Sequence, residues 1–522
     1  MRDTNLLCNT DDPDQLSFGR VRRLSSADAN EVIKAIKGSQ APKKRKCLSF
    51  TPIISIIIFC VFYLVPIFPL YPTAHTCLAI LVLGGILWGT EIIPSYITAY
   101  LMPLLSVWLA IGYDPETGQR MKASKLATDI AAKFMDPIIF VFLGSLTMSA
   151  GLTKLQITDR VSSFALSKIS KKPRVVLFTI MLLNFTTAAF LSNIASTTLL
   201  LTFSLPIIRS LDPDEPFIKA LLLGLAWSGN AGGMVTTIAS VQNILAIKYI
   251  NESGAAEISF IEWIAFAGPT AVIVLLFYYF YTIFRYKTKL EIIFVDMKEH
   301  SFGKWTWQHT FTCFITVLTI VLWALQETFS SFFGHVGITA LLPVVALFSA
   351  KILNSEDFGH LRWSTLVLMG GGIALGESIH ASGLLILLSD AITKAMANIP
   401  IWAVTFIFLL VEGILVSVIN HTSAAAILFP VLNTIGLNFG NQTIFLTLSA
   451  LMIGNSQLFH ISSFPTALVS GVQRHKKNDP ANLEAEPFLP GPEFFFAGWP
   501  IVLGAVIIIG TVGYGLVYVM KL

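Results

Sequence analysis

Charged residues are scarce in this sequence, and their scarcity indicates the class of protein. Only 13% of its 522 residues are Asp, Glu, Lys or Arg, whereas a soluble domain contains about 25%. Hydrophobic residues make up 54% of the chain, and the mean hydropathy is +0.72. The sequence therefore predicts an all-α polytopic membrane protein in contact with lipid. The net charge of +4 gives no reason to expect nucleic acid as a partner.

Paired cysteines and an N-terminal apolar leader are also missing. The five cysteines are scattered without a CxxC pair, which argues against a resident metal site or a disulfide framework. Residues 1–50 are polar and basic, so no cleavable signal peptide is visible and we expect a disordered cytosolic tail. In this tail Ser25 and Ser26 resemble a kinase target, and Cys47 follows a basic cluster, where it could be palmitoylated. The sequence leaves both modifications open.

The sequence is rich in long apolar runs. Runs of about 17–25 residues match the thickness of a hydrocarbon core. They are found at 51–71, 75–92, 96–112, 137–167, 175–208, 217–250, 263–284, 310–329, 334–350, 363–395, 402–437, 443–471 and 495–520. Two of these runs, 175–208 and 402–437, are too long for one helix and have polar residues at their centre. We interpret each as a re-entrant helical hairpin, which leaves about eleven spanning helices.

Basic residues indicate the orientation of the chain. If the N-terminal tail is cytosolic, the segments that face the cytosol are 168–174, 285–304, 351–362 and 472–492. Each of them has an excess of Lys and Arg near the membrane, as the positive-inside rule requires. The outside loop 114–133 also contains several basic residues, which runs against the rule. We expect a cytosolic linker at 287–307 and a C-terminus outside.

The centres of the two hairpins have similar polar sequences. Ser192-Asn193 lies in an apolar context, and about 228 positions later Asn420-His421-Thr422 lies in a matching one. Hydroxyl and amide groups at membrane depth are costly unless they are buried in protein or line a site. Two such interruptions, one in each half of the chain, are typical of the midplane binding site of a transporter.

A second interrupted helix follows each hairpin. The segment 217–250 contains glycine, hydroxyl and amide residues between Trp227 and Asn243, which predicts that this stretch unwinds. The segment 443–471 contains an Asn-Ser-Gln run and Pro465, near which the helix is expected to break. Hairpins and interrupted helices match at a nearly constant offset of about 225 positions. We therefore expect two inverted membrane repeats, 51–286 and 308–522.

The polar centres of the two hairpins and the polar stretches 227–243 and 454–466 of the interrupted helices contain no Lys or Arg. An unwound segment offers oxygens to a small cation, and a restarting helix offers N–H groups to an anion. Ser and Thr often bond only to their own helix, whereas Asn193, Asn230 and Asn455 need several partners. His421 is either a core histidine, a proton-coupling group or a donor to the substrate.

The hairpin tips resemble those of the divalent anion:sodium symporter family within the ion transporter superfamily. The similarity runs from about residue 50 to the C-terminus. That family has Ser-Asn-Thr in both tips, whereas this chain has Ser192-Asn193-Ile194 and Asn420-His421-Thr422. The departure argues against a dicarboxylate or citrate substrate.

The membrane part of the fungal and protist low-affinity phosphate permeases is more similar. The shared residues are His421, Gly232-Gly233-Met234, Gln242-Asn243 and Ser462-Ser463-Phe464-Pro465. Those permeases usually have an N-terminal SPX regulatory domain, which this sequence is expected to lack. Thr466 stands where Asn is common in the family, and this changes the second cation site.

The resemblance implies a homodimeric elevator transporter that moves inorganic phosphate with sodium as coupling ion and needs no cofactor. We expect an integral, multi-pass protein of the plasma membrane or of a vacuole-like organelle, and the sequence leaves the choice between the two open. The residues expected near the anion are Asn193, Thr237, His421, Thr422 and Ser463. The residues expected near the cation are Ser192, Asn193, Gly229, Asn230, Thr422, Gly454 and Asn455.

Three other functions stay open at this point. Within transporters, the chain could carry a dicarboxylate, citrate or sulfate, or it could couple to protons through His421. From another class, it could be an anion channel. An enzyme is not expected, because the spans contain neither a nucleophile with its base nor a metal-ligand spacing.

Overall fold

The structure is a computed structural model that describes most of the chain. The described residues are 51–90, 92–114, 119–167, 171–253, 258–293, 303–325, 330–396, 398–475 and 485–521. The expected tail, with Ser25, Ser26 and Cys47, lies outside them, as do residues 294–302 of the expected linker 287–307.

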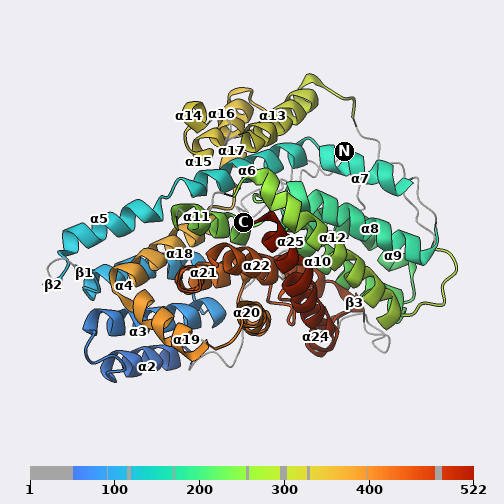
Figure 1. The fold of residues 1–522 in the computed structure, drawn as a ribbon. Coiled ribbons are helices and arrows are strands. Elements are labelled where there is room, and N and C mark those ends of the chain that lie inside the picture. Colours follow the sequence, from blue (N-terminus) through green and yellow to red (C-terminus); the bar gives the residue numbers. More distant parts are fainter. Residues whose placement is uncertain are drawn as a thin grey trace, which may run out of the picture.

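Most of the described chain is helical (Figure 1). The helices of the first half are α2 (Thr51–Leu64), α3 (Pro72–Thr90), α4 (Ser95–Trp108), α5 (Ala123–Phe134), α6 (Ile138–Lys154), α7 (Ile157–Ser167), α8 (Pro173–Phe190), α9 (Asn193–Ser210), α10 (Pro216–Gly232), α11 (Val241–Ser253) and α12 (Phe260–Arg285). Those of the second half are α13 (Trp307–Ala324), α14 (Ser330–Phe333), α15 (Val336–Thr339), α16 (Leu341–Ser349), α17 (Ser355–Gly359), α18 (Trp363–Ala381), α19 (Leu384–Met396), α20 (Ile401–Leu415), α21 (His421–Asn438), α22 (Gln442–Asn455), α23 (Phe464–Ser470), α24 (Gly491–Ile508) and α25 (Tyr514–Met520). A π-helical turn, Ile509–Gly513, joins α24 to α25.

Strands are confined to two short antiparallel pairs in the described chain. β1 (Tyr113–Asp114) pairs with β2 (Gln119–Arg120), and β3 (Gln473–His475) pairs with β4 (Ala485–Pro487). Both pairs lie in connections between helices, so they do not form a core.

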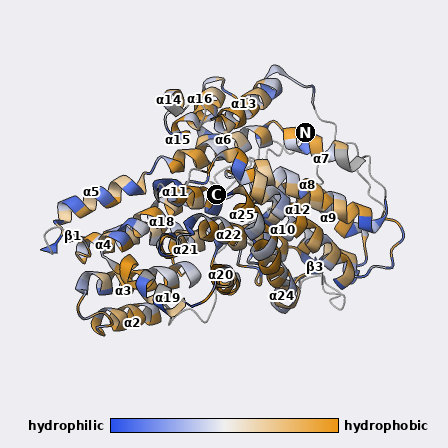
Figure 2. Cartoon of the chain, in the orientation of Figure 1, coloured by the Kyte–Doolittle hydropathy of each residue, from blue (hydrophilic) through white to orange (hydrophobic). Residues whose placement is uncertain are grey.

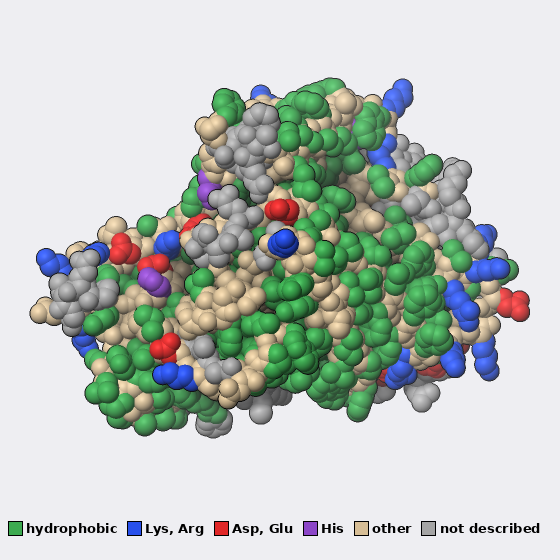
Figure 3. All heavy atoms as spheres, viewed as in Figure 1, with side chains coloured by type: hydrophobic (Ala, Val, Ile, Leu, Met, Phe, Trp, Pro, Cys, Tyr) green, Lys and Arg blue, Asp and Glu red, His purple; other side chains and the backbone are tan. Residues whose placement is uncertain are grey.

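The prediction of a helical membrane protein is confirmed. By length and composition, six helices of the described residues can cross a membrane, or seven if α18 and α19, bent by 79°, count as one span. Others, including α20 and α22, are apolar but shorter, so the count of eleven stays a prediction. Figure 2 shows hydrophobic residues along most helices, and in Figure 3 Lys and Arg gather at the right-hand end, where α8 begins and α9 and α12 end.

Each half contains the same sequence of four helices, and the two sets are interlocked. In the first, α8 and α9 both pack on α10; in the second, α20 and α21 both pack on α22. The next helix of each set packs on the opposite half: α11 packs on α21 and α22, and α23 packs on α9 and α10. The end of each broken helix is therefore held by the opposite half of the chain.

Three segments differ from the sequence expectations. The expected loop 114–133 contains β2 and helix α5, whose apolar residues Leu126 and Ile130 are buried. The run 137–167 forms two helices, α6 and α7. The stretch from Trp227 to Asn243 does not unwind throughout, because α10 continues to Gly232.

Candidate functional site

The first helix break spans residues 233–240, between α10 and α11. Gly232 has to be glycine, since an added Cβ would overlap the carbonyl oxygen of Phe185 and lie 2.9 Å from the Cβ of Ala188 in α8. The amide of Asn243 donates to the carbonyl oxygens of Gly233 at 2.9 Å and Thr236 at 2.8 Å. The break is therefore an ordered segment whose backbone carbonyls are partly satisfied by a side chain.

The second break spans residues 456–463, between α22 and α23. Ser463 caps α23 in a capping box with Thr466, and Pro465 lies in the first turn, where its missing N–H costs nothing. Pro465 thus starts the new helix after the break. In position and polarity this segment corresponds to the first break.

His421 connects the second break to the start of α21. Its backbone N–H donates to the carbonyl oxygen of Ser462 at 3.2 Å, and its ring Nε2 lies 3.0 Å from the carbonyl oxygen of Ser456. Because a carbonyl oxygen can only accept, Nε2 carries a proton in this arrangement. The residue is 5% exposed, so His421 is a buried residue that positions the break.

A chain of amide side chains joins the two breaks. Asn193, at the start of α9, donates through Nδ2 to Oδ1 of Asn230 at 3.1 Å. Asn230, in the last turn of α10, donates in turn to Oε1 of Gln457 at 2.9 Å and to Oγ of Ser463 at 2.7 Å. Helix α9, the first broken helix and the second break therefore meet at Asn230, which is 1% exposed.

The two expected glycines differ in how closely they are packed. A Cβ on Gly229 would overlap the Thr197 hydroxyl and lie 2.9 Å from the Asn184 amide nitrogen. A Cβ on Gly454 would lie 3.1 Å from Nε2 of Gln242, a residue of α11 in the other half. Both glycines thus lie beside polar groups, and only Gly229 is closely packed on more than one side.

Asn455 has a different environment from its counterpart Asn230. Its Oδ1 accepts a hydrogen bond from the Tyr278 hydroxyl at 2.9 Å, and its Nδ2 donates to the carbonyl oxygen of Leu451 at 2.7 Å. These bonds fix Asn455 against α12, so one lone-pair direction of its oxygen is already used.

The other expected residues are placed less directly. Ser192 accepts from the backbone N–H of Ile194 at 3.3 Å and caps α9, and the Thr422 N–H donates to Asn420 at 3.0 Å. Thr237 is buried inside the first break. No hydrogen bond among the described residues joins the side chains of these three expected ligands to the amide chain.

Several functional candidates were not singled out from the sequence. Among the described residues, Gln457 Nε2, Ser240 Oγ and Asn243 Oδ1 are buried without a hydrogen-bond partner. Such atoms are rare in folded proteins and are available to a ligand. Gln457 could donate to an anion and Asn243 could accept a cation. The sequence signal was an amide in each interrupted stretch, but of these amides only Asn230 and Asn455 were expected near an ion.

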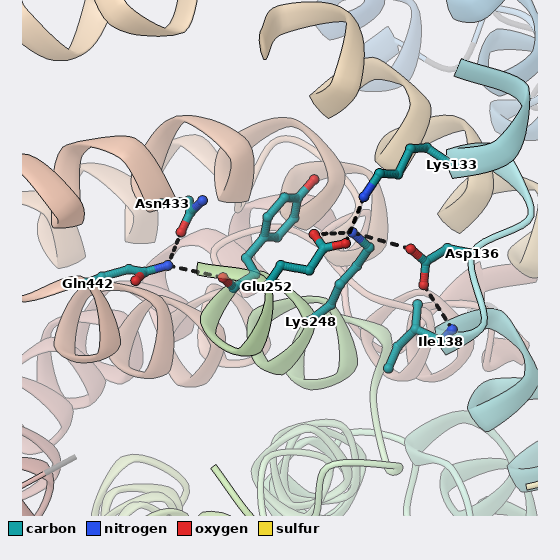
Figure 4. A network of polar contacts seen from close by, with 8 residues as sticks. Lys133, Asp136, Ile138, Lys248, Glu252, Asn433 and Gln442 are labelled. Atoms are coloured by element: carbon teal, nitrogen blue, oxygen red, sulfur yellow. Dashed lines mark hydrogen bonds and ion pairs between the residues drawn. The ribbon is translucent and has the colours of Figure 1, made fainter. Parts of the chain in front are cut away.

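A charged network holds the far end of α11 (Figure 4). Lys248, with a side chain only 4% exposed, pairs with Asp136 at 3.4 Å and with Glu252 at 2.6 Å, and Glu252 also pairs with Lys133 at 2.9 Å. Burial acts to raise the pKa of Glu252, but the hydrogen bonds and charges of Lys248 and Lys133 outweigh it and hold this pKa below its usual value. The network ties α11 to the junction of α5 and α6, away from the breaks.

Apolar helices and two linked polar breaks define an α-helical membrane transporter. A family model described as citrate transporter matches residues 85–454. The chain belongs to this family of transporters, which confirms the resemblance drawn from the hairpin motifs.

Two of the similar proteins are yeast phosphate transporters. The chain is 30% identical over 451 residues to the inorganic phosphate transporter PHO87 of Saccharomyces cerevisiae, covering 85% of this chain and 47% of the relative. It is 30% identical to the low-affinity phosphate transporter PHO90 of the same yeast, covering 85% and 49%. The chain thus spans about half the length of these relatives.

Two further similarities come from bacteria. The sodium-dependent dicarboxylate transporter SdcS of Staphylococcus saprophyticus is 25% identical, with 74% of this chain and 77% of the relative covered. The solved structure of MtrF from Neisseria gonorrhoeae, described as one of a class of antimetabolite efflux pumps, has a TM-score of 0.51 at 13% identity and covers 84% of this chain and 97% of that one. The latter likeness concerns the fold alone.

Proposed function

We propose that the chain is a secondary active transporter that moves inorganic phosphate together with sodium. The observation that supports this most is the amide chain from Asn193 through Asn230 to Gln457 and Ser463, which brings both breaks to one place. Amide and hydroxyl groups can bind a small oxyanion from several directions at once.

The absence of fixed positive charge explains the coupling. Neither break, 233–240 or 456–463, contains Lys or Arg. In a region of low dielectric constant an anion is then bound well only when a cation lies beside it. Each ion raises the affinity for the other, so neither is carried efficiently alone.

We assign the two ions to neighbouring parts of this region. The anion would contact Asn193, Thr237, His421, Thr422 and Ser463, with Gln457 as an added donor. The cation would lie near Ser192, Asn193, Gly229 and Asn230 in the first half and near Thr422, Gly454 and Asn455 in the second. The yeast relatives named as phosphate transporters support the choice of anion, and the sodium-dependent relative supports the choice of cation.

The interlocked packing supports an elevator movement. Because α11 and α23 each pack on the opposite half, the two hairpins and the two broken helices would move as one body. This proposal includes two re-entrant hairpins and a homodimeric scaffold. It also includes about eleven spanning helices, more than the six or seven described ones that are long and apolar enough to cross a membrane.

A second candidate substrate is a dicarboxylate or citrate. The family description and the named dicarboxylate relative favour it. The hairpin tips argue against it, because neither reads Ser-Asn-Thr.

Transport by the purified chain in proteoliposomes tests the proposal. We expect saturable uptake of labelled phosphate that an inward sodium gradient stimulates and that excess succinate, citrate or sulfate leaves largely unchanged. Complete competition by succinate would replace phosphate by a dicarboxylate. Uptake that neither saturates nor depends on sodium would indicate a channel.

A further inference from the structure

A single acidic residue lies inside the apolar first arm of the second hairpin. Helix α20 contains mostly large apolar residues, and Glu412 is its only charged residue. The side chain is 3% exposed. An ionisable group in such a place is costly, so it is normally retained for a function.

The carboxyl group of Glu412 is only half satisfied. Oε1 accepts a hydrogen bond from the Ser449 hydroxyl of α22 at 2.7 Å. Oε2 is buried and has no hydrogen-bond partner among the described residues. An ionised carboxylate needs more donors than this, because both oxygens accept from several directions.

No charged group of the neighbouring helices balances Glu412. Helices α22 and α24 and the π-helical turn pack on α20. Helix α22 and the turn contain no titratable residue, and the only one in α24 is Glu493 at its start, which pairs with Lys219 at 3.1 Å. The arm itself lies against Val502, much further along α24.

The second break also touches this arm, and its one titratable residue lies elsewhere. His460 packs its ring near Phe494, with 6.1 Å between the ring centroids. A carboxylate without a nearby cation in an apolar interface is unfavourable, and the group then takes up a proton. The surroundings of Glu412 therefore favour its neutral, protonated form.

Glu412 is also linked to the moving parts. One turn further on, the Ser417 hydroxyl donates to the carbonyl oxygen of Gly413 at 2.6 Å and accepts from the N–H of Leu458 at 3.2 Å. The Ser462 hydroxyl donates to the carbonyl oxygen of Ser417 at 2.6 Å. A change of charge on Glu412 would thus act on the end of α20 that holds the second break.

We propose that Glu412 is a proton-binding site of the transport cycle, in addition to the sodium site. The carboxylate takes one proton from water on one side of the membrane and releases it to water on the other side. This proposal rests on the proposed transport of phosphate. It predicts that a proton gradient contributes to uptake beside the sodium gradient.

The test uses the full chain in proteoliposomes at a fixed sodium gradient, with and without an inside-alkaline pH gradient. One coupled proton raises the accumulation of phosphate by up to about tenfold per pH unit. We expect this increase in the wild type, its retention in Glu412→Asp, and its loss in Glu412→Gln with sodium-driven uptake preserved. Phosphate itself changes protonation with pH, so the difference between wild type and Glu412→Gln is the decisive quantity. Glu356→Gln, on the exposed surface of α17, is the matched control and should behave like the wild type.

The outcomes separate the two proposals. Absence of phosphate uptake in the wild type would overturn the proposed function itself. Uptake in which Glu412→Gln responds to the pH gradient as the wild type does would overturn only the proton site. If Glu412→Gln fails to fold, Ser449→Ala is the second variant, because it keeps the acid but removes its hydrogen bond. Phosphate uptake is then measured as a function of pH, and the midpoint of this profile should shift relative to the wild type. An unchanged midpoint would then contradict the proposal.

Discussion

Helices α8 and α20, the first arms of the two proposed hairpins, occupy equivalent places in the two halves but differ in chemistry. Asn184 in α8 precedes Glu412 in α20 by 228 positions, the same offset that separates Ser192 from Asn420 at the tips. Both residues are buried on the face that packs against the broken helix of their own half. The two halves therefore repeat the backbone without repeating the side chain.

The hydrogen bonds of the two residues show how far the halves differ. Asn184 donates to the carbonyl oxygen of Leu225 at 2.7 Å and accepts from the Ser196 hydroxyl at 2.6 Å, so both ends of its amide are paired. Glu412 has one partner, Ser449. We infer that the first arm has a structural amide, whereas the second has a group that can change its charge.

The largest expected effect concerns the structural amide. Asn184→Ala leaves several buried polar groups without partners and should lower the free energy of unfolding by about 3 kcal/mol. Glu412→Gln keeps an acceptor for Ser449 and should change it by less than about 1 kcal/mol. Thermal unfolding in detergent compares the two variants. Equal losses would show that the arms are not functionally distinct.

The glycines of the two broken helices extend this comparison. Gly229→Ala places a Cβ on the Thr197 hydroxyl, and we expect overpacking of about 2 kcal/mol and a corresponding loss of uptake of at least about tenfold. Gly454→Ala meets only the flexible end of Gln242 and should cost less than about 1 kcal/mol. Phosphate uptake and thermal unfolding measure both. A stronger effect at Gly454 would reverse the assignment of the tighter site to the first half.

A substitution of His421 tests whether the proton binds at Glu412 or at this histidine. His421→Gln disturbs the bond to the carbonyl oxygen of Ser456, and sodium-driven uptake should fall about fivefold, as for about 1 kcal/mol of lost hydrogen bonding. Its stimulation by the pH gradient should persist, because the proton is assigned to Glu412. Loss of this stimulation in His421→Gln, together with its survival in Glu412→Gln, would move the proton site to the histidine.

The smallest effect is expected outside both arms. Lys133 pairs with Glu252 with 40% of its side chain exposed, so Lys133→Met should cost about 0.5 kcal/mol. The pH profile of uptake should match that of the wild type. If Lys133→Met altered the pH profile of uptake as Glu412→Gln does, pH would be acting on uptake through the stability of the whole protein. Measuring uptake and thermal unfolding of the same variant distinguishes the two cases.

The sequence predicted where helices begin and end better than it predicted which side chains contact one another. Polar residues in apolar runs indicated the interruptions, and α9 and α21 begin at Asn193 and His421. The extent of the first break was overestimated, because α10 accommodates Gly229 and Asn230 where α8 and α9 supply polar partners. Such partners are distant in sequence and leave no local pattern.

Glu412 and Gln457 both escaped prediction, for related reasons. Glu412 is a single acid in a long apolar run, so it hardly alters the hydropathy of that run. Gln457 gains its role from Asn230, which lies in the other half of the chain. The positions of the expected ions and the number of spanning helices remain predictions.

The central claim is that both breaks form one site in which an anion and a cation bind together. Equilibrium binding of labelled phosphate to the purified protein, with sodium and with potassium in its place, tests it most directly. We expect saturable binding that sodium tightens and that Asn230→Ala weakens by about tenfold or more. Binding that is equally tight without sodium, or that is unchanged in Asn230→Ala, would contradict the account.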